Sequence, residues 1–436
     1  MNKLSKYNFF VENDKNTILY NAASDQRIAV LPQLADLVKD NEDNIDKLQD
    51  IHPDFYKELV ARGFVVGEDI DEAAEVVKRW REIEASPTSY SITILPTLDC
   101  NCRCWYCYEE HNAGTNMKPE TVELVKKHID LKLSSPEMKY FHLGFFGGEP
   151  LMGFNNVVMP LLSFSKQRCE EKGIRFDAHF TTNATLLTDK MISEMKGLDI
   201  PISFQITLDG NREAHDSVRC TRFGKPTFDT IIKNIHKLLK KQFKVGLRVN
   251  YTNANIDTTS DIVDEFKDLA EGEKIWLNVF FQQVWQDIIF HPKAVYRKEK
   301  IEKFFGKHQM TVPMDAIRMT RCYADCENKI VINFNGDIYK CTARDFTKKN
   351  REGVLCADGH IEFNTRYEKR MRLKHTHKTC LECNIYPICQ GGCSQNILEN
   401  KLREGCIYND TNQTKKKFIQ RRLSALISSA NEKCLT

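Results

Sequence analysis

Hydrophobic residues in the middle of the chain follow two alternating spacings, one typical of strands and one typical of helices. Short runs rich in β-branched and aromatic residues predict strands at residues 91–95, 140–146, 175–181, 200–208, 244–250 and 274–281. Helical spacing between these runs predicts helices at residues 119–133, 156–172, 188–195, 228–240 and 259–269. Strands that alternate with helices of this length form parallel βαβ units. The pattern therefore predicts an α/β fold, a partial (β/α)6 barrel of the TIM type.

The first 75 residues have a different pattern. Strand-like runs lie at residues 8–11, 17–20 and 27–31, and helical patterns follow near 34–39 and 53–61. Gly63 supplies a stop signal for the last of these helices. Three strands followed by short helices predict a small winged-helix domain at residues 1–75. A charged helix at 69–84 leads into a linker at 76–90, with Pro87 at the boundary.

The composition is that of a soluble globular protein. The 436 residues are 41% hydrophobic and 28% charged, with a formal net charge of +3, which gives no field that would favour nucleic acid. The first ten residues lack the apolar core of a signal peptide, and no apolar run is long enough to cross a membrane. We therefore expect a cytoplasmic protein without a membrane or nucleic-acid partner. In that reducing compartment, the 16 cysteines favour metal or redox roles over disulfides.

Three cysteines follow the first predicted barrel strand. Cys100, Cys104 and Cys107 have a C-x3-C-x2-C spacing, with Tyr106 before the last of them. Thiolates select soft metals and iron–sulfur clusters, and a cubane normally takes four cysteine ligands. Three thiols can therefore hold three irons and leave the fourth open to a small molecule. The position suits this role, because the chemistry of a barrel lies at the C-terminal ends of its strands.

This cysteine motif resembles the signature of radical S-adenosylmethionine (SAM) enzymes. The resemblance implies that the open iron binds the amino and carboxylate groups of SAM. It also implies that an electron from the cluster cleaves SAM to a 5′-deoxyadenosyl radical, which abstracts a hydrogen atom from the substrate. Cys102 fits neither spacing. We interpret it as a bystander thiol, with a shifted ligand set as the alternative.

Two further elements resemble the same family at the ends of later strands. Gly147-Gly148-Glu149-Pro150 resembles the GGEP element, in which glycines allow close backbone approach and the carboxylate can pair with the SAM ammonium group. Thr182-Asn183 resembles the Thr-Asn-Gly element on the ribose side of SAM, with Ala184 in place of the glycine.

The segment from Gln205 to Arg219 contains Leu-Asp-Gly and His-Asp-x-x-Arg, and it resembles the same run in the peptide-modifying branch of the family. Arg219 is the candidate for the SAM carboxylate, because a guanidinium suits bidentate pairing, and Arg222 is the alternative. The resemblance thus implies a SAM site made of Tyr106, Gly147, Gly148, Glu149, Pro150, Asn183, Gln205 and Arg219.

A second cysteine field begins at Cys322 and resembles the SPASM domain, which we place at residues 321–410. The resemblance implies two auxiliary [4Fe–4S] clusters, hence three clusters in all. Auxiliary cluster I would use Cys322, Cys326, Cys341 and Cys393, and auxiliary cluster II would use Cys380, Cys383, Cys389 and Cys406.

Alternatives stay open in this field. Paired C-x2-C units also suit structural zinc. The gap between Cys322 and Cys326 is shorter than the family pattern, so cluster I could use Cys356 or keep an open iron. Cys169, Cys220 and Cys434 are interpreted as ordinary thiols.

SPASM proteins mostly modify peptides or proteins, and two features divide this branch. Residues 1–75 resemble a PqqD-like peptide-recognition (RRE) domain, which implies a leader peptide that adds a strand to the small sheet. The alternative is that residues 1–75 form a generic N-terminal cap domain that binds no ligand. Thr342 follows Cys341, where the anaerobic sulfatase maturases carry a catalytic Asp, and Thr is not a credible general base. Asp337 and Asp345 are close in sequence but do not occupy the position of that catalytic Asp, so no general base is assigned.

We therefore expect a radical SAM maturase that abstracts hydrogen from a ribosomally made precursor peptide. The expected product is crosslinked or cyclised through a thioether, C–C or C–O bond. The expected partners are the precursor peptide and an electron donor such as flavodoxin or ferredoxin. A sulfatase maturase that makes formylglycine and a non-catalytic peptide-binding partner are the alternatives.

The remaining segments complete the expected organisation. The barrel domain occupies residues 91–285, a bridging region 286–320, and a C-terminal helix or tail 411–436, with a basic amphipathic pattern at 414–429. Phe280, Phe281, Gln282, Gln283 and Trp285 end the sixth barrel strand and could line a substrate pocket, although core packing is favoured for the aromatic residues.

Overall fold

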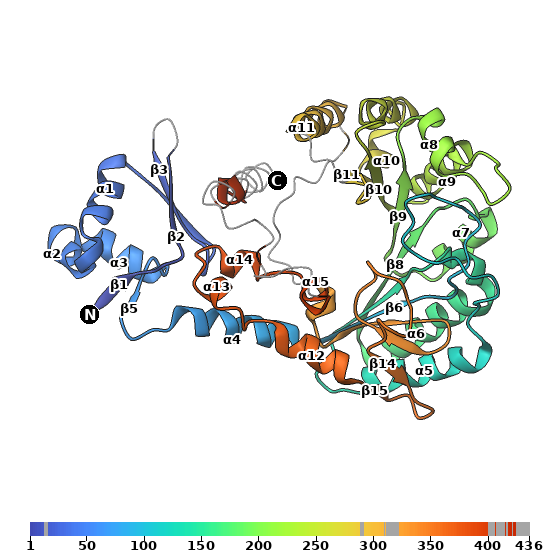
Figure 1. Ribbon diagram of the computed structural model, residues 1–436, viewed down its shortest axis with the longest axis horizontal. Coiled ribbons are helices and arrows are strands. Elements are labelled where there is room, and N and C mark those ends of the chain that lie inside the picture. The colour runs from blue at the N-terminus through green and yellow to red at the C-terminus, as the bar shows by residue number, and fades with distance from the viewer. Residues whose placement is uncertain are drawn as a thin grey trace. The chain divides into compact units, whose positions relative to one another are not determined.

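A computed structural model describes residues 1–12, 16–287, 292–308, 310, 322–399, 406, 415, 417–420, 422 and 423 (Figure 1). The chain divides into two compact units. One unit comprises Met1–Ala85, Met314–Cys326 and Glu368–Thr436, and the other comprises Ser86–Pro313 and Glu327–Tyr367. The tail pattern at 414–429 and the bridging region at 286–320 lie partly outside the described residues.

The larger unit is built on a sheet of ten strands in the order β11-β10-β9-β8-β7-β6-β12-β13-β14-β15. The predicted barrel strands are β6 (Ser89–Ile94), β7 (Tyr140–Phe145), β8 (Arg175–Thr182), β9 (Ile202–Leu208), β10 (Lys244–Tyr251) and β11 (Leu277–Gln283). Each runs parallel to its neighbours in the sheet. The predicted α/β fold with a large parallel sheet is therefore confirmed.

Helices connect these strands and cover the sheet (Figure 1). They are α5 (Pro119–Leu133), α6 (Met159–Lys172), α7 (Asp189–Gly197), α8 (Arg212–Val218) and α9 (Phe228–Lys240). Short 3-10 and π turns at Pro150–Gly153 and Phe154–Val158 precede α6. The long predicted helices are thus present, in the positions that a βαβ pattern requires.

The connection after β10 differs from the prediction. Instead of an α-helix at 259–269, the chain forms a 3-10 helix, η4 (Ile256–Glu265), and a short α10 (Glu271–Lys274). Thr258 and Thr259 donate their hydroxyls to the carbonyls of Asn255 and Ile256, three residues earlier, at 2.8 and 2.6 Å. Such local bonds compete with α-helical geometry. Strand β11 consequently begins at Leu277, later than predicted.

The sheet also extends beyond the predicted strands. β12 (Lys329–Ile332) pairs parallel with β6, although more than two hundred residues separate them in the chain. β13 (Asp337–Tyr339), β14 (Gly353–Leu355) and β15 (Ile361–Phe363) then continue antiparallel. α11 (Pro292–Lys307) follows β11, and α12 (Thr365–Leu373) follows β15. The segment from Lys329 to Phe363, which contains Cys341 and Cys356, thereby extends the sheet of the larger unit on the β6 side.

The two faces of the barrel strands differ in polarity. Alternate residues such as Phe141, Phe180 and Phe204 are buried with the covering helices, and the rings of Phe180 and Phe204 stack 5.2 Å apart. The opposite, inner face carries half-exposed polar residues, because successive side chains of a strand point to opposite faces. These inner residues include Ser91, His142, Asp177, His179, Ser203, Gln205 and Arg248.

In the smaller unit, the three predicted strands form an antiparallel sheet in the order β2-β3-β4. They are β2 (Asn8–Glu12), β3 (Thr17–Asn21) and β4 (Gln26–Val30), followed by α1 (Pro32–Asp40), the 3-10 helix η1 (Glu42–Lys47), α2 (Leu48–Ile51) and α3 (Pro53–Ala61). The predicted strands and helices of this segment are confirmed. β1 (Asn2–Leu4) and β5 (Val65–Gly67) add a two-stranded sheet that the pattern did not predict.

One core of the smaller unit joins the two ends of the chain. Tyr7 and Tyr20 pack with Trp80 of α4 (Glu72–Glu84) and with Tyr386 and Phe418. The Trp80 indole donates to the carbonyl of Pro387 at 3.2 Å. The charged helix predicted as a linker therefore has a buried face in this core.

Short elements in this unit include η5 (Tyr323–Asp325), α13 (Lys378–Leu381), α14 (Tyr386–Cys389) and α15 (Ser394–Leu398). In the described part of the chain, no helix is long and apolar enough to cross a membrane.

Candidate active site

The three predicted cluster cysteines lie in the loop after β6. Cys100 is buried, and Cys104 and Cys107 are half-buried. The pKa of the Cys107 thiol is raised to about 12, mainly by burial and to a smaller extent by the neighbouring Cys104 and Cys100. The three sulfurs are therefore within electrostatic range of one another, on a loop that shields them from water.

Cys102 lies inside this loop and contacts Cys100. Its backbone N–H donates to the Cys100 sulfur at 3.4 Å, and Cys102 also pairs as a β-bridge with Thr221. Arg103 N donates to Cys220 O at 3.1 Å on the same bridge. A side-chain hydrogen bond from Cys102 lowers the pKa of Cys100. The thiolate form that binds metals is thus favoured at Cys100.

The loop after β7 packs directly on the cysteine loop. Gly147 and Gly148 have positive φ angles of 81° and 50°. A Cβ at Gly148 would lie 2.1 Å from the carbonyl oxygen of Asp99, and one at Gly147 would lie 2.1 Å from Leu95 Cδ2. Only glycine fits at either position, because it has no Cβ and tolerates left-handed backbone.

Glu149 is fully buried and is held by its own chain. Its carboxylate accepts hydrogen bonds from Leu151 N at 3.0 Å, Thr182 Oγ1 at 2.6 Å and Asn183 N at 2.8 Å. Burial raises the pKa of Glu149, and these three donors oppose that shift. The carboxylate therefore ties the β7 loop, including Pro150, to the end of β8.

Asn183 and Ala184 continue this contact. The Asn183 amide donates to Asn101 Oδ1 at 2.9 Å and approaches the Cys100 sulfur at 3.7 Å. Ala184 has a φ angle of 59°, in the left-handed region that favours glycine. Asn234 Nδ2 holds the Ala184 carbonyl at 2.8 Å, which stabilises this uncommon conformation.

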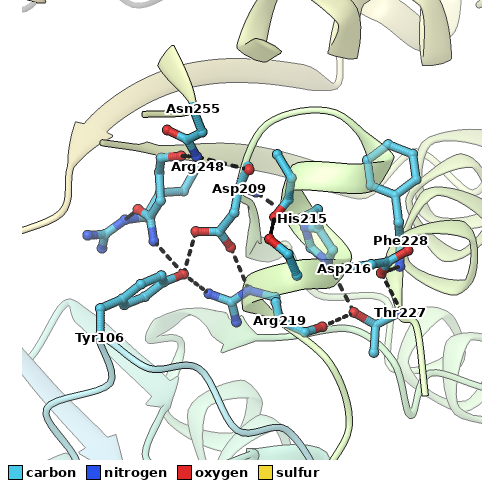
Figure 2. A network of polar contacts seen from close by, with 12 residues as sticks. Tyr106, Asp209, His215, Asp216, Arg219, Thr227, Phe228, Arg248 and Asn255 are labelled. Carbon is cyan, nitrogen blue, oxygen red and sulfur yellow. Dashed lines mark hydrogen bonds and ion pairs between the residues drawn. The ribbon is translucent and has the colours of Figure 1, made fainter. Parts of the chain in front are cut away.

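Figure 2 shows Tyr106, Asp209 and Arg219 pointing toward one another. The Tyr106 hydroxyl donates to Asp209 Oδ1 at 2.6 Å and accepts from Arg219 Nη2 at 2.6 Å and Asn250 Nδ2 at 3.0 Å. Arg219 Nε donates to Asp209 Oδ2 at 3.0 Å. This network links the cysteine loop to the ends of β9 and β10. The guanidinium predicted to bind a carboxylate is already paired with one from its own chain.

Residues of the His-Asp-x-x-Arg run hydrogen-bond to the segments on either side of Arg219 and to Asp209 (Figure 2). His215 Nδ1 accepts from Asp209 N at 3.2 Å, and its Nε2 lies 3.0 Å from Thr227 Oγ1. Thr227 in turn donates to the Arg219 carbonyl. Asp216 accepts from Thr227 N at 2.7 Å and from Phe228 N at 3.0 Å. His215 and Asp216 therefore position the loop that carries Arg219.

The other predicted residues lie around this centre. Arg222 donates to Asp99 Oδ1 and to Cys100 O, both at 2.9 Å, so it braces the cysteine loop. Gln205 lies half-buried on the inner face of β9, in register with Gly246. Gln286 Nε2 donates to Tyr106 O at 2.8 Å, which joins the end of β11 to the same loop.

Sequence reasoning missed two residues at this site. Glu109 accepts from Gly148 N at 2.7 Å, and burial raises the pKa of its carboxyl to about 7. Asn250 ends β10 and holds the Tyr106 hydroxyl. The available signals were a carboxylate two residues after Cys107 and a polar residue at a strand's C-terminal end.

Aromatic residues border the site on one side. The rings of Tyr108 and Trp285 stack 6.5 Å apart, and the Arg344 guanidinium lies 5.9 Å from the Trp285 ring. Trp285 is 58% exposed, so the preference for core packing is wrong for this residue. It is confirmed for Phe281, which is buried against Phe305.

The predicted ligands of auxiliary cluster II lie together in the smaller unit. Burial raises the pKa of the Cys389 thiol to about 11, with further contributions from Cys380, Cys383 and Cys406. Four thiols are therefore within electrostatic range of one another. Within the described residues, no three Cys, His, Asp or Glu side chains converge closely enough to hold a single metal ion.

The residues predicted for auxiliary cluster I belong to different units. Cys322 is exposed, Cys326 is buried and Cys393 is exposed, all in the smaller unit. Cys341 and the alternative Cys356 are half-buried in the larger unit. This ligand set stays a prediction.

A protein-family model matches the region of this chain that contains the cysteine loop. The model of the Radical SAM superfamily matches residues 94–271, from the last residue of β6 to the first residue of α10. Residues 94–271 form a radical SAM domain. Enzymes of this superfamily bind SAM and a [4Fe–4S] cluster.

Relatives extend the similarity beyond the radical SAM domain. A serine-type anaerobic sulfatase-maturating enzyme of Bacteroides thetaiotaomicron is 25% identical over 68% of this chain and 80% of its own. The radical SAM cyclopropyl synthase TigE of Paramaledivibacter caminithermalis is 24% identical over 78% of this chain and 76% of its own. The structure of Streptococcus suis SuiB bound to precursor peptide SuiA covers 93% of this chain and 98% of its own, with 16% identity and a TM-score of 0.52.

The residues around the cysteine loop of the radical SAM domain fit these cofactors. Three thiols on one loop are a suitable donor set for a cubane with one open iron. Gly148 leaves its loop in backbone contact with Asp99, where a Cβ would intrude. The half-exposed polar residues on the inner face of the sheet suit a hydrophilic ligand.

Proposed function

We propose that this protein is a radical SAM maturase that oxidises a ribosomally made precursor peptide and forms a crosslinked or cyclised product. The observation that carries the proposal is the Tyr106–Asp209–Arg219 network, which joins the Cys100–Cys107 loop to the inner face of an open polar sheet. Cofactor residues and a face suited to a polar substrate are thereby linked in one unit.

In this proposal, Cys100, Cys104 and Cys107 hold the cluster. The bound cofactors supply a 5′-deoxyadenosyl radical that removes a hydrogen atom from the substrate. Gly147, Gly148 and Pro150 shape the loop against which SAM binds. Glu149 and Asn183 act mainly by fixing that loop to the end of β8, because their polar groups already bind the chain.

Arg219 and Gln205 complete the proposed SAM site from β9 and the loop beyond it. Arg219 keeps Asp209 and Tyr106 as partners through Nε and Nη2. A guanidinium carries five N–H donors, so donors remain for the SAM carboxylate. Tyr106 then sets the distance between the cysteine loop and this cation.

A peptide substrate is supported by the relatives and by the N-terminal sheet. The names of two matched proteins describe a cyclopropyl synthase and a protein bound to a precursor peptide. β2 and β4 are the edge strands of the small sheet, and an edge strand can accept a further strand through main-chain hydrogen bonds. We propose residues 1–75 as the RRE domain that binds the leader peptide in this way.

The second cysteine field supplies the electron path in this proposal. Cys380, Cys383, Cys389 and Cys406 would hold auxiliary cluster II, and Cys322, Cys326, Cys341 and Cys393 would hold auxiliary cluster I. The smaller unit would then contain both a leader-binding sheet and a cluster. Clusters held by these residues would supply an acceptor for the electron released when the substrate radical is oxidised. An electron donor such as flavodoxin or ferredoxin is the proposed partner that reduces the SAM cluster.

A sulfatase maturase is the second candidate, because a serine-type enzyme of that class is similar over 68% of the chain. The residue after Cys341 argues against it. Thr342 cannot take the proton that an Asp would take at the same position. The two candidates therefore differ in the substrate and in the product.

Mass spectrometry of peptide products separates the two candidates. The reconstituted protein is incubated anaerobically with SAM, a reductant and either a short precursor peptide encoded beside its gene or a sulfatase peptide with Ser or Cys. We expect the precursor to lose two hydrogen atoms without gaining an aldehyde that reacts with a hydrazide. An aldehyde on the sulfatase peptide would favour the second candidate. A variant with Cys100, Cys104 and Cys107 replaced by Ala is the inactive control.

A further inference from the structure

Arg248 places a positive charge on the inner face of the sheet. It lies on β10, and its Nε donates to Asn250 Oδ1 at 2.8 Å. In the part of the chain that the structure describes, no carboxylate lies within ion-pair distance of this guanidinium. Figure 2 shows Arg248 beside the Tyr106 network, with its guanidinium turned away from Asp209.

The carboxylate whose charge acts on Arg248 is already engaged. Asp209 accepts from Tyr106 through Oδ1 and from Arg219 through Oδ2. Asp209 and Arg219 therefore balance each other, and Arg248 leaves this part of the inner face with an excess positive charge. Burial lowers the pKa of Arg248, which reflects the cost of removing an uncompensated cation from water. An anion bound beside it would offset that cost.

The position of Arg248 favours a ligand other than SAM itself. Asn250 contacts the Tyr106 hydroxyl and so lies level with the cysteine loop. Arg248 is the next residue on the same face of β10, about 7 Å farther from the strand's C-terminal end. It is in register with Phe280 of β11 and Thr207 of β9. The guanidinium therefore lies on the polar inner face of the sheet, one step along β10 from the residue that contacts Tyr106.

We propose that Arg248 binds a carboxylate of the substrate peptide, the side chain of an Asp or Glu near the residue that is modified. This inference rests on the proposed function, because it takes the substrate to be a peptide. A guanidinium can bind a carboxylate through two parallel N–H donors, which fixes orientation as well as charge. Arg248 would thus select acidic segments and hold them in register below the cysteine loop.

Equilibrium dialysis tests the proposal without turnover. The reconstituted protein is dialysed against two pools of random peptides of equal length, one with a central Glu and one with a central Gln, and the bound peptide is measured by mass spectrometry. We expect the wild-type protein to retain the Glu pool about tenfold better, a ratio in keeping with a charge-assisted pair. R248Q should lose this preference, and R248K should keep part of it.

Lys244→Gln is the matched control, since it removes a cation from the exposed start of the same strand. It should retain the full preference for Glu. SAM binding is measured in parallel by dialysis with SAM alone. A preference that persists in R248Q, or one that is absent from the wild type, overturns the proposal. Weaker SAM binding by R248Q with an unchanged Glu preference also overturns it, because Arg248 would then serve the SAM carboxylate.

These outcomes are independent of the proposed function. A protein that prefers the Glu pool through Arg248 but modifies no precursor peptide would contradict the maturase assignment alone. A protein that modifies its precursor without any preference for Glu would contradict the Arg248 site alone.

Discussion

The backbone N–H of Cys102 donates to the sulfur of Cys100 at 3.4 Å, and the Cys102 side chain makes a second hydrogen bond to the same sulfur. Cys102 is 1% exposed, and a β-bridge to Thr221 fixes it. Hydrogen bonds to cluster sulfurs help to set reduction potential. Cys102 is therefore placed to change the reduction potential of the cluster that Cys100 would hold.

Cys102→Ala should keep the backbone donor and remove the thiol donor. A lost hydrogen bond of about 1 kcal/mol corresponds to roughly 40 mV for a one-electron couple. The reduction potential of the SAM cluster should become more negative by that amount, because donors stabilise the more negatively charged reduced state. Redox titration followed by electron paramagnetic resonance measures the shift. Cys169→Ala, which removes a buried thiol from α6, should leave the potential unchanged.

Asp209→Asn should destabilise the network around Tyr106. The Asp209 side chain is 2% exposed and pairs with Arg219, which is 12% exposed. Removing one charge of a buried pair leaves the other uncompensated, so the free energy of unfolding should fall by about 3 kcal/mol. Urea unfolding under anaerobic conditions measures the change.

Asp229→Asn is the control for this substitution. Asp229 pairs with Arg212 at the surface, and both side chains are more than half exposed. Its effect on the free energy of unfolding should stay within about 0.5 kcal/mol. Equal effects of the two substitutions would contradict a buried, uncompensated charge at Arg219.

Gly148→Ala should disrupt the contact between the β7 loop and the cysteine loop. The added Cβ would lie 2.1 Å from Asp99 O, and the φ angle of 50° is unfavourable for Ala. Together these effects should cost about 2–4 kcal/mol, and SAM binding measured by dialysis should be lost. Gly197→Ala, at the end of α7 with open space around it, should instead stabilise the fold by about 0.5 kcal/mol and leave SAM binding intact.

The features that could be predicted from sequence are local ones. The strand and helix patterns depend on neighbouring residues, and most of them are present in the fold. The cysteine spacing and the Gly147–Gly148 pair are also local, because a few adjacent residues determine both the loop and its contacts. Sequence reasoning therefore placed the candidate site at the ends of β6 and β7.

The features that sequence reasoning missed depend on distant partners. Nothing in the sequence near Glu149 shows a partner for its carboxylate, but Thr182 at the end of β8 and Asn183 just after it both donate hydrogen bonds to it. β12 joins the sheet beside β6 only because the chain returns from a distant segment. Trp80 lies in a charged helix, and its buried contact with Pro387 has no local signal. Tertiary packing decided each of these outcomes.

Acid sensitivity should depend on His128, which is 1% exposed in α5. Its Nδ1 lies 2.7 Å from Gly359 O and its Nε2 lies 2.9 Å from the Tyr90 hydroxyl, contacts that suit a neutral ring. Burial lowers the pKa of His128 from 6.5 to about 4, so its stabilising contribution is complete above about pH 6.5 and is lost as the pH falls toward 4. Between pH 6.5 and 5, the free energy of unfolding should fall by about 1.1 kcal/mol per pH unit more in the wild type than in His128→Gln. Urea unfolding at both pH values measures this difference, and His179 and His215, whose pKa values are also lowered, cancel because they are present in both proteins. His360→Gln, at an exposed turn, should behave like the wild type, and an equal acid loss in His128→Gln would assign the sensitivity to other groups.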